Sequence, residues 1–200
     1  MVEARFLKSS FHLMNHTMIT HAQNVRTMPS AIITRLATQF DVSAISALQA
    51  RVFGPGRFAR SAYRVREGKG LISRFCRVAD RNGRLLASLR ITEVAIGGTR
   101  GAALLGPVAV DQDFRGQGFG RQIIGETMAD MKSAGIGLVV LVGDEPYYGR
   151  FGFHPVPRGQ IAFPGPVNPQ RILAAELTPG SLAHFHGLIT AAPAAAVGEI

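Results

Sequence analysis

The chain has 200 residues, which is enough for one domain with a substantial buried core. Its hydrophobic fraction of 46% is ordinary for a globular protein, and no apolar run approaches the length needed to cross a bilayer. The formal net charge is +9, but the basic residues are scattered and form no block interleaved with aromatic residues. We interpret them as a solvated surface that also favours a polyanionic ligand, and we expect no membrane and no nucleic-acid partner. They include Arg57, Arg60, Arg64, Arg66, Lys69, Arg74 and Arg77.

Cys76 is the only cysteine, so no disulfide can form within the chain. This is typical of a reducing compartment, and we expect a cytoplasmic protein in which Cys76 is a small core residue. Residues 1–30 contain one acidic residue and no uninterrupted apolar segment. They are expected to form a disordered extension, with a transit-like peptide as the alternative.

The first structured elements are expected after that extension. Ala31–Ala37 predicts a strand, and Asp41 is placed to cap a helix. One face of that helix is apolar and comprises Val42, Ile45, Leu48 and Val52. Gly54-Pro55-Gly56 ends it, and Phe58–Arg66 predicts a second helix. No catalytic motif is recognisable in this region.

A hairpin is expected next. Arg74–Ala79 and Leu85–Ile96 flank an Asn82-Gly83 pair, and Asn-Gly strongly favours a tight turn between strands. Period-two alternation places four apolar residues on one face of the second strand: Leu85, Ala87, Leu89 and Ile91. Glu93 falls on that same face. It is a candidate general base, unless the strand bulges or ends there and leaves its carboxylate in water.

The segment from Leu104 to Asp144 predicts a strand, a glycine-rich turn, a helix and a strand. Leu104–Val110 is apolar on both faces, although its Gly106-Pro107 pair favours a bulge or an open edge. The helix begins at about Gly120, and its apolar stripe comprises Ile123, Ile124, Thr127, Met128 and Met131. The turn before it is Arg115-Gly116-Gln117-Gly118-Phe119-Gly120-Arg121. The first amides of a helix have no partner within the helix and attract anions, so this turn predicts a phosphate or pyrophosphate site.

Two common phosphate motifs do not fit this turn. A Walker A loop requires Gly-x-x-x-x-Gly-Lys-Ser/Thr, which the chain lacks. In the dinucleotide pattern G-x-G-x-x-G, starting at Gly116 places Arg121 at the third position, and starting at Gly118 places Ile123 there. A dinucleotide is therefore the minor alternative, with Asp144 as its acidic residue.

The spacing Arg115-x-x-Gly118-x-Gly120 resembles the acyl-coenzyme A signature Gln/Arg-x-x-Gly-x-Gly/Ala of the GCN5-related N-acetyltransferases, the GNAT family. About 30 residues further on, the run from Pro146 to Phe153, PYYGRFGF, resembles the short helix, tyrosine and Gly-Phe ending of that family. The resemblance covers roughly residues 31–180. It implies an α/β fold: a mixed, twisted sheet of six to seven strands with helices on both faces and splayed central strands.

The resemblance also implies acetyl-CoA as co-substrate and a role for each motif residue. The turn residues Arg115, Gly116, Gln117, Gly118, Gly120 and Arg121 would hold the pyrophosphate, and backbone groups of Val108 and Val110 would pair with the pantetheine arm. Tyr148 would protonate the leaving thiolate, whereas Tyr147 is expected to pack in the core. Because Gly149 is a poor helix former, the short helix is expected to be a single turn.

Asp144 and Glu145 follow the second strand of this segment, where open α/β sheets place ligands. Either acid could deprotonate an amine, or it could serve only to start the turn before Pro146. Ile172–Leu177 predicts the last strand, and residues 181–200 are expected to form a C-terminal tail.

We therefore predict an enzyme that moves an acetyl group from acetyl-CoA to a primary amine by direct attack, without a metal. Glu93, Asp144 or water would remove the amine proton. A non-catalytic module that binds acyl-CoA as a sensor is the alternative. The acceptor stays open among a small amine, an amino acid, an antibiotic, a peptide N-terminus and a lysine, and the family resemblance leaves a homodimer open.

Overall fold

The computed structural model of the protein describes residues 32–56 and 61–192. The expected N-terminal extension, residues 1–30, lies outside the described residues, as do residues 57–60 and 193–200. The predicted Phe58–Arg66 helix is therefore described only from residue 61 onward.

The described residues contain nine strands, which belong to one sheet. They are β1 (Ile33–Leu36), β2 (Arg77–Arg81), β3 (Arg84–Ile96), β4 (Thr99–Val110), β5 (Leu138–Val142), β6 (His154–Pro155), β7 (Ile161–Ala162), β8 (Ile172–Glu176) and β9 (Gly187–Ala191). Seven follow the order β1-β2-β3-β4-β5-β8-β6, while β9 pairs with β3 and β7 pairs with β9. Along the seven-strand order only β4 and β5 run parallel. The mixed α/β sheet is confirmed, and β7 and β9 extend it beyond the expected strands.

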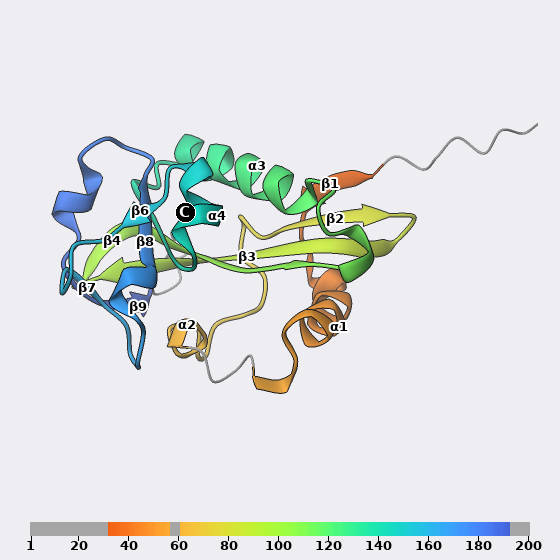
Figure 1. Ribbon diagram of the computed structural model, residues 1–200, viewed down its shortest axis with the longest axis horizontal. Coiled ribbons are helices and arrows are strands. Elements are labelled where there is room, and N and C mark those ends of the chain that lie inside the picture. The colour runs from red at the N-terminus through yellow and green to blue at the C-terminus, as the bar shows by residue number, and fades with distance from the viewer. Residues whose placement is uncertain (1–31, 57–60, 193–200) are drawn as a thin grey trace, which may run out of the picture. The chain divides into compact units, whose positions relative to one another are not determined.

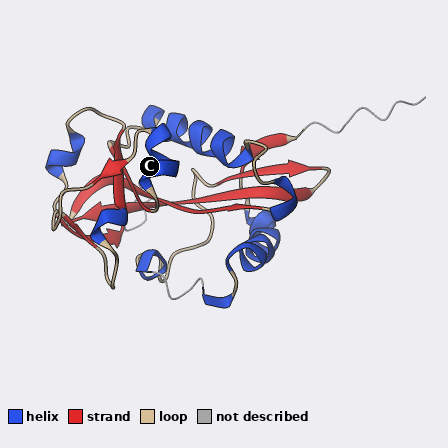
Figure 2. Cartoon of the chain, in the orientation of Figure 1, coloured by secondary structure: helices blue, strands red, loops and turns tan. Residues whose placement is uncertain are grey.

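The helices cover both faces of this sheet (Figures 1 and 2). They are α1 (Val42–Phe53), α2 (Ser61–Arg64), α3 (Phe119–Ser133) and α4 (Glu145–Tyr148). Along one face lies α3, whose Ile123, Ile124 and Met131 join the core cluster that contains Leu89 and Ile91. On the opposite face, α1 buries Ile45 and Leu48 against Val78 and Ala109. The apolar stripes predicted for both helices are thus the faces that the sheet covers.

The pairing of the two parallel strands stops half-way along β4. Ala102, Ala103 and Leu104 pair with Leu138, Val139 and Val140, and no pair with β5 follows. On its other side β4 continues to pair with β3, with a register shift at Gly106-Pro107. The end of β4 from Leu105 to Val110 therefore faces β5 with unpaired backbone groups, which confirms the predicted splay and bulge.

The hairpin forms at the predicted turn. Asn82 and Gly83 have φ angles of +52° and +77°, the left-handed conformation that this pair adopts readily. Ala87, Leu89 and Ile91 contribute to the α3-side core as predicted. Leu85 instead joins the α1-side cluster. The β2–β3 register shifts between Ala79 and Asp80, which breaks the strict alternation at this end of the strand.

Two further expectations need correction. The Asp41 side chain does not cap α1; its carboxylate accepts two 2.8 Å hydrogen bonds from Arg35 and one from the amide of Thr38. The described part of the expected C-terminal tail, up to residue 192, belongs to the domain. Its strand β9 pairs with the end of β3 because Ile189 has apolar neighbours to bury against. The strand predicted over Ile172–Leu177, which is β8, is therefore not the last.

Candidate active site

The glycine-rich turn and the splayed end of β4 line a hollow of about 610 Å³, the cofactor-side hollow. It contains every residue predicted to hold the cofactor: Val108, Val110, Arg115, Gly116, Gln117, Gly118, Gly120 and Arg121. The rest of its lining comprises Val52, Phe53, Phe114, Phe119, Tyr147, Tyr148 and Arg150. The structure thus brings together two segments that were assigned to one ligand from sequence alone.

Backbone conformation and crowding explain the glycines of this turn. Gly116 and Gly118 have φ angles of +75° and +89°, which other residues adopt only under strain. A Cβ at Gly120 would lie 3.3 Å from both the Tyr147 hydroxyl and Cγ2 of Val110. The first two glycines therefore shape the turn, and the third allows the helix to approach the strand.

The N-terminus of α3 is open to a ligand. Gly118 is its N-cap, and in the described chain no side chain accepts a hydrogen bond from the first amides of the helix. These amides carry the positive end of the helix dipole. Arg115, Arg121 and Arg150 line the same hollow and add positive charge. The arrangement fits a phosphate or pyrophosphate group.

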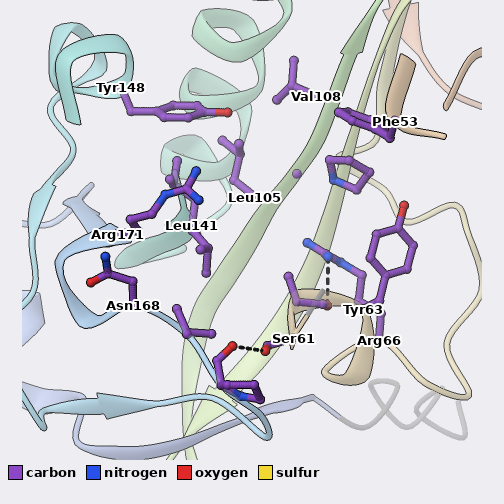
Figure 3. Close-up of a pocket in the computed structure, with 16 residues that line it drawn as sticks. Phe53, Ser61, Tyr63, Arg66, Leu105, Val108, Leu141, Tyr148, Asn168 and Arg171 are labelled. Carbon is purple, nitrogen blue, oxygen red and sulfur yellow. Dashed lines mark hydrogen bonds between the residues drawn. The ribbon is translucent and has the colours of Figure 1, made fainter. Parts of the chain in front are cut away.

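A second hollow of about 390 Å³, the acceptor-side hollow, lies along the same splayed strand (Figure 3). It is lined by Phe53, Ser61, Ala62, Tyr63, Arg66, Leu105, Gly106, Pro107, Val108, Leu141, Val142, Tyr148, Pro166, Val167, Asn168 and Arg171. Three of these residues, Phe53, Val108 and Tyr148, also line the cofactor-side hollow. The two hollows therefore meet at the predicted general acid.

Tyr148 is held as a neutral phenol at this junction. Burial, followed by the neighbouring Tyr147 and Asp144, raises the pKa of Tyr148 to about 12. Its ring packs edge-to-face on Phe153, and a Cβ at Gly143 would lie 2.5 Å from its Cε2 atom. Gly143 thus leaves the space that the ring occupies, and the hydroxyl points into the acceptor-side hollow (Figure 3).

The neighbouring tyrosine does not pack in the core as predicted. Tyr147 is 40% exposed, lines the cofactor-side hollow and lies under the guanidinium of Arg150, 5.1 Å from its Cζ atom. The single helical turn predicted for this motif is confirmed, because α4 spans four residues and ends in a 3-10 turn over Gly149–Phe151. Consecutive positions in so short a helix point in different directions, so only one of the two tyrosines reaches the core.

Glu93 is not brought together with Tyr148. Its carboxylate accepts a 2.7 Å hydrogen bond from Arg74 and lines a different hollow, of about 470 Å³, near the C-terminal end of α3. Its neighbour Thr92 points to the other face of the sheet, where it accepts a hydrogen bond from Arg66. The alternation of β3 therefore carries the Glu93 side chain away from both hollows at the splay.

Asp144 lies close to the junction but on its outer side. Its side chain is 72% exposed and pairs with Arg171, with 3.2 Å between Oδ1 and Nε. Its backbone carbonyl accepts hydrogen bonds from the amides of Tyr147 and Tyr148. Asp144 thus starts α4 and partners an arginine of the acceptor-side hollow without lining that hollow itself.

Comparison with known proteins places this geometry in a family. The model of the acetyltransferase (GNAT) domain matches residues 34–156, which is more than half of the chain. The chain belongs to the GNAT acetyltransferase family. It is accordingly an acyltransferase of the N-acetyltransferase class.

Two relatives have been solved with a coenzyme. The chain is 29% identical over 123 residues to the uncharacterized N-acetyltransferase YhbS of Escherichia coli K12. The aligned residues cover 61% of this chain and 73% of the relative. The crystal structure of Escherichia coli YhbS in complex with CoA superposes with a TM-score of 0.69 at 26% identity, covering 82% of this chain and 91% of that one. A GNAT acetyltransferase from Brucella melitensis in complex with acetyl-CoA gives a TM-score of 0.54 at 29% identity, over 72% and 96% of the chains.

Sequence analysis missed most of the acceptor-side hollow of this GNAT domain. The interpretation of the basic residues as a solvated surface is wrong for Arg66, which is 4% exposed and lines the hollow. Burial, and then the charge of Arg90, lowers the pKa of Arg66 to about 9. No motif identified Phe53, Ser61 or Asn168 either, because contacts across the fold and not local patterns bring them together.

Other site types find no support in the part of the chain that the structure describes. There, no cluster of three or more His, Cys, Asp and Glu side chains is arranged to hold a metal ion. Likewise, none of the described helices combines the length and the apolar character that a membrane crossing requires.

Proposed function

We propose that the protein transfers the acetyl group of acetyl-CoA to a primary amine bound in the acceptor-side hollow. The observation that carries this proposal is the meeting of the two hollows at Phe53, Val108 and Tyr148. A phosphate-rich coenzyme on one side and an amine on the other would approach each other at the partly buried phenol of Tyr148. The presence of CoA or acetyl-CoA in two related structures supports a coenzyme in the cofactor-side hollow.

The residues on the cofactor side fit the parts of acetyl-CoA. The open N-terminus of α3 with Arg115 and Arg121 would bind the pyrophosphate through amides and charge. The unpaired backbone of Val108 and Val110 would pair with the amides of the pantetheine arm, because a secondary amide chain pairs best with free main-chain groups. When bound, the coenzyme supplies an activated acetyl group as a thioester.

The chain's own residues then supply positioning and one proton. The amine nitrogen attacks the thioester carbonyl, forming the C–N bond as the C–S bond breaks. Tyr148 donates its phenolic proton to the leaving sulfur and recovers one from water. An amide of the unpaired end of β4 polarises the carbonyl oxygen.

The amine proton leaves to water or to Asp144. No carboxylate lines the described acceptor-side hollow, and Glu93 lies in a different one. Of the three candidates for accepting that proton, Glu93 lines a different hollow, and Asp144 pairs with Arg171 of the acceptor-side hollow, so Asp144 and water are the better candidates. The amine must therefore lose its proton near the solvent-exposed rim before it attacks, since an ammonium has no lone pair.

The first experiment is a calorimetric titration with acetyl-CoA of the wild type and of a Gly118→Glu variant. A carboxylate at the open end of α3 should repel the pyrophosphate and abolish micromolar binding. Gly135→Glu is the matched control: its φ of +79° is equally left-handed, no atom lies within 4 Å, and it follows the other end of α3. Absence of binding to the wild type would overturn the proposal.

Thiol release in the presence of an amine panel separates an enzyme from a sensor. An enzyme should release CoA only when an amine is present, one equivalent per amide formed. The alternative, a module that holds acyl-CoA without transferring it, would bind the coenzyme and release no thiol with any amine. The presence of a partly buried, protonated Tyr148 at the junction favours the enzyme.

A further inference from the structure

We propose that the acceptor-side hollow selects an amine that also carries a carboxylate, such as an amino acid, with the Arg66 guanidinium as the counter-charge. This inference rests on the proposed function, since it names the substrate class of the same site. It stands on three observations: the charge of the lining, the bonding of Arg66, and the rigidity with which the fold holds it.

The lining of the hollow is basic. Its charged side chains are Arg66 and Arg171, and neither an aspartate nor a glutamate is among the described lining residues. Arg171 is half exposed and already paired with Asp144, so its charge is largely balanced. Arg66 is left as the dominant charge of the buried part. A polycationic acceptor would find no carboxylate there for its additional ammonium groups.

Arg66 is a buried cation without an anionic partner. Its Nε donates to the Thr92 hydroxyl at 3.2 Å and its Nη1 to the carbonyl of Ala62 at 2.9 Å, while Nη2 has no partner among the described residues. Both partners are neutral. By contrast, the partly buried guanidinium of Arg77 pairs with Glu126 and Asp130. An unpaired buried charge is costly, so a carboxylate that entered the hollow would find its attraction hardly screened.

The fold holds this guanidinium in place before any ligand arrives. Arg66 follows α2, and its two hydrogen bonds tie it to that helix and to β3 on the sheet face opposite α3. In Figure 3 the guanidinium and the Tyr148 hydroxyl enter the hollow from different walls. A small molecule with a carboxylate at one end could thus present its amine toward Tyr148. A preordered fork that need not reorganise favours specific carboxylate binding.

Arg90 provides the matched control for a purely structural role. It is also buried, at 6% exposure, and donates to the backbone carbonyls of Lys69 and Gly70. It lines neither the acceptor-side nor the cofactor-side hollow. If Arg66 only braces the fold, then Arg66→Gln and Arg90→Gln should alter catalysis alike.

The test compares kcat/KM, from acetyl-CoA-dependent thiol release, for α-amino acids and for the amides of the same compounds. The wild type should prefer the acids by about tenfold or more, the size expected of a charge-assisted hydrogen bond. In Arg66→Gln this preference should vanish through a raised KM for the acids, with little change for the amides. In Arg90→Gln it should persist. A wild-type preference for amides or for polyamines would overturn the inference, as would a preference that survives in Arg66→Gln.

Two further measurements keep the result interpretable. Calorimetric binding of acetyl-CoA is measured for each protein, and absence of binding in the wild type overturns the proposed function. If the wild type binds acetyl-CoA but acetylates no amine that carries a carboxylate, the carboxylate inference is overturned and the proposed function stands. If Arg66→Gln does not fold, the inference is tested by measuring competitive inhibition of the wild-type protein. The deaminated acids should compete with the acceptor, and their amides should compete at least about tenfold less well. Equal inhibition by acid and amide would sink the inference.

Discussion

The two hollows that meet at Tyr148 are built in different ways. The cofactor-side hollow draws most of its wall from Phe114–Arg121 and Tyr147–Arg150, two short runs of consecutive residues. The acceptor-side hollow draws its wall from α2, the middle of β4, the end of β5 and the loop before β8. One hydrogen bond that closes it joins Ser61 to Pro166, 105 positions apart. A ligand shared by a family can be held by a local motif, whereas the proposed acceptor would be recognised by residues that only the tertiary fold brings together.

The largest expected effect is at the junction itself. Tyr148→Phe removes the proposed proton donor without changing the ring that packs on Phe153. We expect kcat to fall about 10²- to 10³-fold, with acetyl-CoA affinity unchanged, because general acid catalysis contributes on this scale. Tyr147→Phe is the control, since its hydroxyl lies beside the turn and not in the acceptor-side hollow. Turnover of Tyr148→Phe within twofold of wild type would remove Tyr148 from the mechanism.

The next effect probes how the junction is shaped. In Gly143→Ala the new methyl group would overlap the Tyr148 ring and Cδ1 of Leu141, at 2.5 Å and 2.8 Å. The ring must shift, so we expect kcat to fall roughly tenfold or more, since small misplacements of reacting groups cost rate steeply. Gly125→Ala, in open space within α3, should leave kcat unchanged and leave stability equal or slightly higher. Equal activity of both variants would mean that the ring position does not matter.

Tyr148, Arg66 and Glu93 show how much of the candidate site could be predicted from the sequence. The glycine turn was predicted because glycines and arginines stand at the start of a helix, and Tyr148 because the run from Pro146 to Phe153 resembles a family motif; both signals lie within short runs of the sequence. Arg66 could not be recognised, because its burial depends on Thr92 and Ala62 and on the α2 position relative to the sheet. Glu93 shows the intermediate case. Alternation predicted its face correctly, but not which hollow lies above that point of the strand.

The pH dependence distinguishes the acid from the base. With a Tyr148 pKa of about 12, the phenol keeps its proton throughout the neutral and mildly alkaline range, and the donor is lost only as the pH rises through that value. For an acceptor amine without a carboxylate, whose binding does not depend on the charge of Arg66, we expect kcat/KM to rise with the fraction of neutral amine and to show no fall up to about pH 10.5. With the ordinary tyrosine pKa of 10, only about a quarter of the molecules would still carry the phenolic proton at that pH. A descending limb near pH 10 that persists in Tyr148→Phe would show that another group is responsible.

The smallest effect on turnover is expected for the ion pair between Arg35 and Asp41, which lies outside both hollows and contributes to stability. The Arg35 guanidinium, hydrogen-bonded to both oxygens of Asp41, holds the pKa of that buried carboxyl well below its usual value of 3.8. Asp41→Asn should lower the free energy of unfolding at pH 7 by about 1–3 kcal/mol and leave kcat unchanged. Urea denaturation measures the first quantity and thiol release the second.

The lowered pKa of Asp41 determines how its contribution to stability changes with pH. Because the pKa of Asp41 is lower in the folded state, its contribution is complete above about pH 4 and declines as the pH falls below that. The stability difference between the wild type and Asp41→Asn should therefore narrow on acidification. Asp113→Asn, at an exposed carboxylate beside Arg84, is the matched control and should cost less than about 0.5 kcal/mol at any pH. If folded Asp41→Asn instead lost turnover, the Arg35–Asp41 pair would influence the two hollows. The route would be α1, whose residue Phe53 lines both hollows.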